Sequence, residues 1–147
     1  MRKPNRLPTY NPPLPSWISV GHPNFSPTDG FTYYFANIPA STPTTTLAPN
    51  VIYLMTRCKI TGAYIVTYSS GAAGTAEDVS LYVRVNNTTN YLIQTVGVAA
   101  IQRDFSNVNM NVPLEPTDFI SIIMVCPTWE TNPTNWKTTG FLRIEEV

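Results

Sequence analysis

The most continuously apolar stretch of the chain covers residues 112–125, VPLEPTDFISIIMV, in which a turn is predicted to lead into a β-strand over residues 119–126. Successive side chains of a strand point to opposite faces. Both sets are apolar here, with Phe119, Ile123 and Val125 on one face and Ile120, Ile122 and Met124 on the other. We expect the core of the domain to cover one face and another copy of the chain to cover the other, with Ile120, Ile122 and Met124 in the contact. A fully intramolecular core is the alternative.

Several other stretches have the pattern of β-strands. The clearest alternation of apolar and polar residues runs over residues 79–85, and the turn-forming sequence NNTTN at residues 86–90 predicts a hairpin over residues 79–96. No stretch shows the 3.6-residue period of an amphipathic helix. The pattern therefore predicts an all-β, antiparallel two-sheet sandwich of about eight strands, most plausibly a jelly roll. The remaining strands are expected at residues 30–38, 51–57, 58–69, 105–112 and 140–145.

Residues 1–29 have a different composition, with seven prolines and no acidic residue before Asp29. Such a density of proline excludes helix and interrupts strand pairing. We expect an extended Pro-rich arm that anchors the molecule to a neighbour, followed by a jelly-roll domain over residues 30–147. Folding of the arm back onto its own domain is the alternative. The basic and large apolar residues expected to dock are Arg2, Lys3, Arg6, Leu7, Tyr10, Leu14, Trp17 and Ile18.

The charge balance narrows the choice of partners. The 147-residue chain has a formal net charge of zero at pH 7 and only 12% charged residues, against about 25% in typical soluble domains. Neither nucleic acid nor a membrane is favoured, and three basic residues in the arm suit an acidic protein groove better than a phosphate backbone. No run reaches the length of about 20 apolar residues that spans a membrane. The start of the sequence has no apolar stretch typical of a signal peptide, so we expect synthesis in the cytoplasm.

Residues for catalysis or metal binding are scarce. His22 is the only histidine and lies in the predicted arm, where it is expected to be solvated. A catalytic triad and a histidine-based metal site are therefore not expected, and no cofactor, metal or catalytic residue is predicted. The cysteines, Cys58 and Cys126, are 68 positions apart. A disulfide between them is possible in principle, but two reduced core thiols are favoured.

The loop over residues 128–138, TWETNPTNWKT, is the best candidate for ligand recognition. Aromatic faces beside amide and carboxylate groups suit a sugar-binding patch. The alternative, which we favour, is that both tryptophans pack on the rim of the sandwich or against another subunit. The candidate glycan-binding residues are Trp129, Glu130, Asn132, Asn135 and Trp136.

Four segments in this order resemble the jelly-roll domain of the tumour necrosis factor and complement globular-head superfamily: ITGAYIVTYSSG, VSLYVRVNN, VPLEPTDFISIIMV and TTGFLRIEE. Leu114, Asp118 and Ile120 match the turn-strand motif of that superfamily. Thr117, after Pro116, stands in the turn where the superfamily has glycine. The final segment is similar to the superfamily's closing strand. The resemblance implies a compact trimer in which inner sheets meet around a three-fold axis.

The segments AEDVSLYVRVNNTTNYLI and CPTWETNPTNWKTTGFLRIEE are also similar to structural proteins of tailed bacteriophages, including head fibres and head decoration proteins of the crAss-like group. This resemblance implies a non-enzymatic virion protein, made in the host cytoplasm, that docks on a capsid or another virion protein through its arm. A glycan-binding module of a receptor-binding or adhesion fibre is the alternative.

Overall fold

The computed structural model describes residues 15–36, 42–47, 50–70, 77–97 and 101–147, and these residues form ten β-strands without a helix. The confirmed fold class is all-β, and most of the strands coincide with the alternating segments of the sequence. The strands are β1 (Ser16–Phe25), β2 (Thr32–Phe35), β3 (Ile52–Tyr53), β4 (Cys58–Ser70), β5 (Asp78–Val85), β6 (Thr89–Gly97), β7 (Gln102–Asn107), β8 (Val112–Leu114), β9 (Phe119–Val125) and β10 (Thr134–Glu146).

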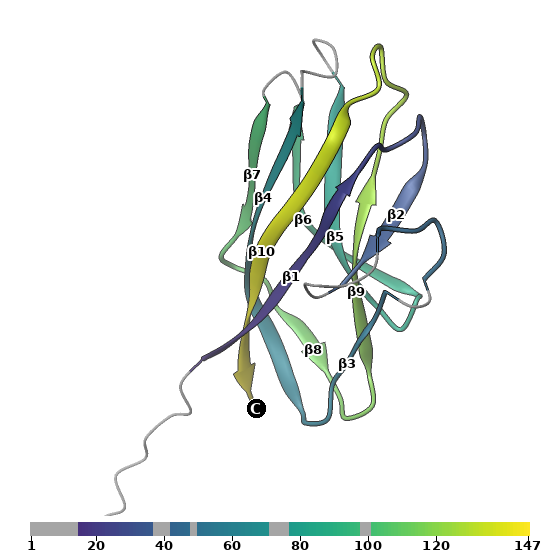
Figure 1. The fold of residues 1–147 in the computed structure, drawn as a ribbon. Helices are drawn as coiled ribbons and strands as arrows, with labels where there is room; N and C mark the ends of the chain where they lie inside the picture. Colours follow the sequence, from purple (N-terminus) through teal and green to yellow (C-terminus); the bar gives the residue numbers. More distant parts are fainter. Residues whose placement is uncertain (1–14, 37–41, 48–49, 71–76, 98–100) are drawn as a thin grey trace, which may run out of the picture.

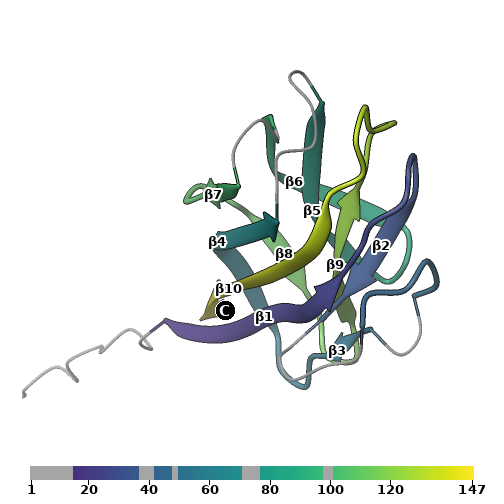
Figure 2. The same ribbon diagram turned by 45° about the horizontal axis from the view of Figure 1, so that its top comes forward.

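The strands form two sheets that pack face to face (Figures 1 and 2). One sheet has the order β1-β10-β4-β7, and β8 extends it by pairing with β4. The other has the order β2-β9-β5-β6, and β3 extends it by pairing with β9. All the strand pairs are antiparallel, and the chain crosses repeatedly from one sheet to the other. This arrangement confirms the predicted two-sheet jelly-roll sandwich.

The core lies between the two sheets and follows the period-2 alternation of the strands. In β5 the inward residues Val79, Leu81 and Val83 are fully buried, while the intervening residues are partly exposed. Burying a large apolar side chain contributes about 1.5–3 kcal/mol. The largest fully buried side chains in the described residues are Trp136, Phe35, Phe105, Ile60, Ile65, Leu81, Leu114, Ile120, Ile122, Ile123, Met124 and Leu142.

The structure corrects the predicted boundary of the N-terminal arm. Residues 16–25 form β1, which pairs with β10 along the edge of one sheet, so the sandwich begins at Ser16 and not at residue 30. Val20 of β1 is fully buried in the core. Pro23 is accommodated because β1 is an edge strand and its register with β10 shifts between His22 and Phe25. For these residues the alternative, folding onto their own domain, holds. Residues 1–14 lie outside the described part of the chain.

The structure also corrects the role assigned to one face of β9. Ile120, Ile122 and Met124 are buried in the core of a single chain, where they cannot contact a sister copy. They point between the sheets because their partners in register on β5, Val85, Val83 and Leu81, also point inward. The outward set of β9 consists of Phe119, Ser121, Ile123 and Val125.

Candidate functional site

An aromatic patch lies on the outer face of the β1-β10-β4-β7 sheet, beside the start of β1. We define the patch as Trp17, Tyr64, Val108 and Phe141, whose exposed fractions are 56%, 41%, 69% and 39%. The Trp17 and Phe141 rings pack edge to face with centroids 4.8 Å apart, and the Tyr64 ring lies 5.9 Å from Phe141. Apolar side chains gathered in this way on a surface mark interaction sites. The aromatic patch is therefore the strongest candidate for a contact surface.

Strand pairing brings the patch together from distant parts of the chain. Trp17 of β1 pairs with Arg143 of β10, and two positions further on Phe141 pairs with Tyr64 of β4. The sequence analysis singled out Trp17 but missed Tyr64 and Phe141. The signal that could have found them is the alternation of side chains, because each lies between inward-facing residues of its strand and must therefore face outward. Of the predicted docking residues, Trp17 lies in the patch and Ile18 packs against the core, while Arg2, Lys3, Arg6, Leu7, Tyr10 and Leu14 lie outside the described residues.

A second apolar row crosses the outer face of the β2-β9-β5-β6 sheet. We define this outer row by its register as Tyr34 on β2, Ile123 on β9, Tyr82 on β5 and Leu92 on β6. Ile123 is buried although it faces outward, because it lies between the two tyrosines, while Leu92 at the edge is 47% exposed. The Arg84 guanidinium lies 5.8 Å from the Tyr34 ring. Much of the cover that the outward set of β9 requires therefore comes from the same chain.

The predicted glycan platform is not formed by the tryptophans. Trp129 and Trp136 are both buried, and their ring centroids lie 6.0 Å apart at the rim of the sandwich. Arg103 lies over the Trp136 ring at 4.4 Å. The rings are thus packed within their own domain, as the favoured alternative predicted, and present no free face to a sugar. Glu130, Asn132 and Asn135 are exposed around them.

A buried polar row crosses the inner face of the β1-β10-β4-β7 sheet. Strand register aligns four residues, one on each strand, and all four are buried: His22, Thr138, Thr67 and Arg103. Burial lowers the pKa of the Arg103 guanidinium to about 10. The Arg103 guanidinium donates a hydrogen bond of 3.0 Å to Ser69 Oγ. This row lies within the same core that contains the two tryptophans.

His22 is buried rather than solvated, which corrects the expectation from sequence. Its ring packs edge-on against Phe25 and Phe35, and Nδ1 donates a hydrogen bond of 2.7 Å to the carbonyl oxygen of Pro23. Burial lowers the pKa of His22 to about 4, and the hydrogen bond to Pro23 opposes this shift. The imidazole is therefore neutral at pH 7.

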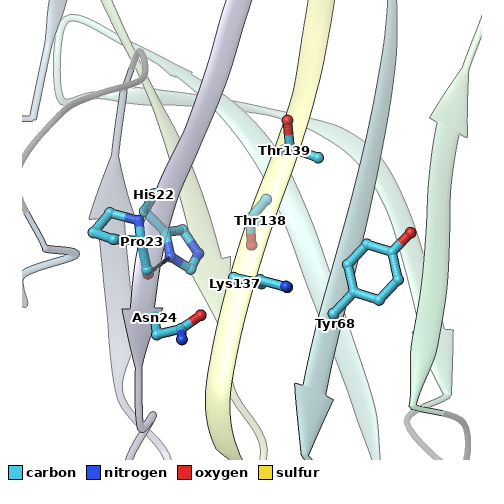
Figure 3. A pocket seen from close by; sticks show the side chains of 7 residues that line it. All are labelled: His22, Pro23, Asn24, Tyr68, Lys137, Thr138 and Thr139. Carbon is cyan, nitrogen blue, oxygen red and sulfur yellow. Dashed lines mark hydrogen bonds between the residues drawn. The ribbon is translucent and has the colours of Figure 1, made fainter.

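An open hollow of about 810 Å³ lies over β1, β10 and β4 near the bulge in β1 (Figure 3). The Lys137 ammonium lies 5.6 Å from the centroid of the Tyr68 ring, and Asn24 and Thr139 contribute amide and hydroxyl groups to the lining. These groups combine an aromatic surface with hydrogen-bond donors and acceptors. The hollow is polar and shallow, unlike the apolar surface around Trp17.

Neither reactive cysteines nor a metal centre occurs in the described residues. Cys58 and Cys126 are buried free thiols, and burial raises the pKa of Cys126 to about 12. No group of three or more His, Cys, Asp or Glu side chains is placed there to hold a metal ion. Within the same residues, no helix is long and apolar enough to cross a membrane.

Comparison with known proteins gives structural likenesses only. No protein-family model matches the sequence, and no curated protein matches it. The structure of infectious bursal disease virus Gx strain is 11% identical in sequence, with a TM-score of 0.46. The match covers 99% of this chain but only 36% of the virus chain. The infectious bursal disease virus VP2 subviral particle is 12% identical with a TM-score of 0.43, covering 99% of this chain and 37% of that one.

Desmodium yellow mottle tymovirus is 13% identical with a TM-score of 0.34, covering 98% of this chain and 94% of the other. At these identities and TM-scores, neither a shared family nor a shared function is established. The case for function therefore depends on the surfaces of the molecule itself.

Proposed function

We propose that the protein is a non-enzymatic structural component of a virus particle, a homotrimeric decoration or head-fibre protein that docks on a capsid through its N-terminal arm. The observation that carries this proposal is the aromatic patch, an exposed apolar surface beside the start of β1. Trp17 is the second residue of β1, two residues after Pro15, and it packs against Phe141. The resemblance of two segments to phage head fibres and decoration proteins, noted from the sequence, supports this role.

The corrected strand boundary improves the deletion that tests the arm. Removing residues 1–14 leaves every described strand intact, whereas removing residues 1–29 would also remove β1 and expose the edge of β10. We expect the shortened protein to remain folded by circular dichroism and to lose binding to particles purified from the source of the sequence. Co-sedimentation of the shortened protein with particles at the level of the full chain would place the anchor in the sandwich.

The location in a particle has a direct test. Antibodies raised against the purified protein should label the surface of those particles, and mass spectrometry should find the chain in them at a constant ratio to the main shell protein. Absence of the chain from purified particles would overturn the proposal.

In the proposed trimer, the contact surface is the outer face of the β2-β9-β5-β6 sheet. The outer row supports this assignment because its side chains are apolar and reach the edge of the sheet at Leu92. Tyr53 and Phe119 extend the apolar surface towards β3, with ring centroids 5.8 Å apart. Light scattering of the full chain at micromolar concentration should give three times the mass of one chain, and a stable monomer would contradict the trimer.

The second candidate function is glycan binding, located in the hollow over β10 rather than at the tryptophans. Tyr68 offers an aromatic surface, and Lys137 and Asn24 offer hydrogen-bond donors around it. Glycan-array binding that is lost in both Tyr68→Ala and Lys137→Ala would support this function. Binding that survives both substitutions would exclude the hollow.

A further inference from the structure

The aromatic patch encloses a small groove whose lining is almost entirely apolar. The groove has a volume of about 100 Å³, with Gly62 and Ala63 between the rings of Trp17, Tyr64 and Phe141. For scale, a cavity of about 150 Å³ holds a benzene molecule. The groove therefore suits one small ring or branched side chain, held between aromatic faces.

The hydrogen-bonding groups around the groove are the Trp17 indole N–H, the Tyr64 hydroxyl and the Arg143 guanidinium, and each can donate a hydrogen bond. Within the described residues, neither Trp17 Nε1 nor Tyr64 Oη takes part in a hydrogen bond. A proline-rich segment has the complementary chemistry, because proline lacks an N–H but keeps its carbonyl, and an extended polyproline helix leaves its carbonyls free. Aromatic-lined grooves are a recurrent way of binding such segments. The groove is thus suited to a proline-rich peptide.

We propose that the groove of each chain binds residues 8–15, PTYNPPLP, of a second copy of the chain. This segment contains four prolines and ends where the described strand β1 begins. One proline ring of the segment would fill the groove, and the carbonyls beside that ring would accept hydrogen bonds from Trp17 Nε1 and Tyr64 Oη. The segment carries no charge. Arg143, the charged residue in the groove lining, already contacts Thr61 and Glu145.

The register of β1 argues for a second copy rather than the same chain. Trp17 pairs with Arg143, whereas Tyr64 and Phe141 lie level with Ser19, further along β1. Ser16, which pairs with Ile144, therefore lies on the far side of Trp17 from the two other rings along the sheet. Binding to its own groove would require the chain to reverse its direction between Leu14 and Trp17. Pro15 fixes its own φ there and restricts the residue before it to extended conformations, which opposes a tight reversal.

The inference rests on the proposed function only in that the arm binds another molecule. It adds that the arm binds the groove of a second copy. One segment in one groove gives a weak contact. When every copy in an oligomer binds the segment of another copy, each further contact forms within the assembly, and the assembly becomes more stable. Arm exchange would then connect copies of the protein before or during docking.

The test uses full-length proteins without particles, so its result is independent of the docking partner. One protein carries Pro12→Cys. A second protein carries Val108→Cys and a tag that makes it longer. The two proteins are mixed and oxidised. Cys58 and Cys126 are buried and serve as an internal control, since the unsubstituted protein should not cross-link. We expect a disulfide-linked product with the summed mass of the two chains. Adding Tyr64→Ala to the Val108→Cys chain should lower its yield about tenfold, as for loss of an interface anchor.

Ile101→Ala is the matched control, because Ile101 is an exposed apolar residue that lies outside both the groove and the proposed trimer contact. It should leave the yield unchanged. Two results would overturn the inference. The first is a yield no greater than that between Pro12→Cys and Ile101→Cys chains. The second comes from a protein that carries both Pro12→Cys and Val108→Cys in one chain. If this protein forms a cross-link only within each chain and none between chains, each arm binds its own groove.

Discussion

The side-chain amide of Asn86 donates a hydrogen bond of 2.7 Å to Asp118 Oδ1, joining the end of β5 to the turn before β9. Asn86 Oδ1 accepts a hydrogen bond of 3.1 Å from Phe119 N, and Asp118 Oδ2 accepts one of 2.8 Å from Glu115 N. The hydrogen bonds from Asn86 and from the Glu115 backbone hold the pKa of Asp118 below its usual range. Two motifs that are 32 residues apart thus form one structural unit.

This unit predicts a non-additive pair of substitutions. Asp118→Ala should lower the free energy of unfolding by about 1–2 kcal/mol, because it removes two hydrogen bonds with net values of about 0.5–1.5 kcal/mol each. Asn86→Ala should have a similar effect. Since the two residues share a bond, the double substitution should cost less than the sum, as measured by urea unfolding. Strict additivity would mean that the Asn86–Asp118 bond contributes nothing to stability.

Thr117 adopts a φ of 79° in the same turn, although it is β-branched. The left-handed region costs a residue with a Cβ about 1–2 kcal/mol, and glycine avoids this cost. We therefore expect Thr117→Gly to raise the free energy of unfolding by about 1 kcal/mol, after the entropy of glycine in the unfolded chain is taken into account. Thermal and urea unfolding would measure it.

Thr45 provides the matched control for this turn, because it is exposed and is not among the described residues with a positive φ. Thr45→Gly should be neutral or slightly destabilising. Equal effects at both positions would show that the turn of Thr117 carries no strain.

The sandwich could be predicted because apolar and polar residues alternate along the sequence of strands such as β5, as the two faces of a half-buried strand require. The first strand was missed because Pro15, Pro23 and Pro27 hide an edge strand in which few apolar residues, Ile18, Val20 and Phe25, contact the core. Edge strands tolerate proline where central strands do not, so proline density marked the edge of the sheet as well as the arm.

The faces of β9 show what the sequence could not decide. Both sets of side chains are apolar, and periodicity separates the sets without saying which one faces the core. The polar member of the outward set, Ser121, was the available clue to the outward face. Likewise, the composition around Trp129 and Trp136 suits an exposed sugar platform and a packed rim equally well. Their burial depends on contacts such as Arg103 over Trp136, which join residues distant in sequence.

His22 predicts that stability falls in mild acid. Its pKa is about 4 in the folded protein and near 6.5 in the unfolded chain. Between these values the unfolded state binds the proton more strongly, so stability should be lost as the pH falls from about 6.5 to 4, by about 3 kcal/mol in total at 1.36 kcal/mol per pKa unit. Urea unfolding at a series of pH values would measure this slope.

The variant His22→Phe keeps an aromatic ring between Phe25 and Phe35 and removes the titration. The variant should therefore lose much less stability over the same pH range, whatever its stability at pH 7. If the slopes of the two proteins are identical, protonation of His22 is not the cause of acid lability.

The last prediction separates the core from the proposed trimer contact. Ile122 is buried between the sheets, so Ile122→Ala should lower the free energy of unfolding by about 2–5 kcal/mol, as is typical for a buried isoleucine. Leu92 lies at the exposed end of the outer row, so Leu92→Asp should change unfolding by less than about 0.5 kcal/mol, as exposed substitutions do. In the proposed trimer, however, Leu92→Asp places a charge in the contact and should give monomers by light scattering. The opposite pattern, in which Ile122→Ala gives stable monomers and Leu92→Asp remains trimeric, would return the trimer contact to the face of β9 that the structure places in the core.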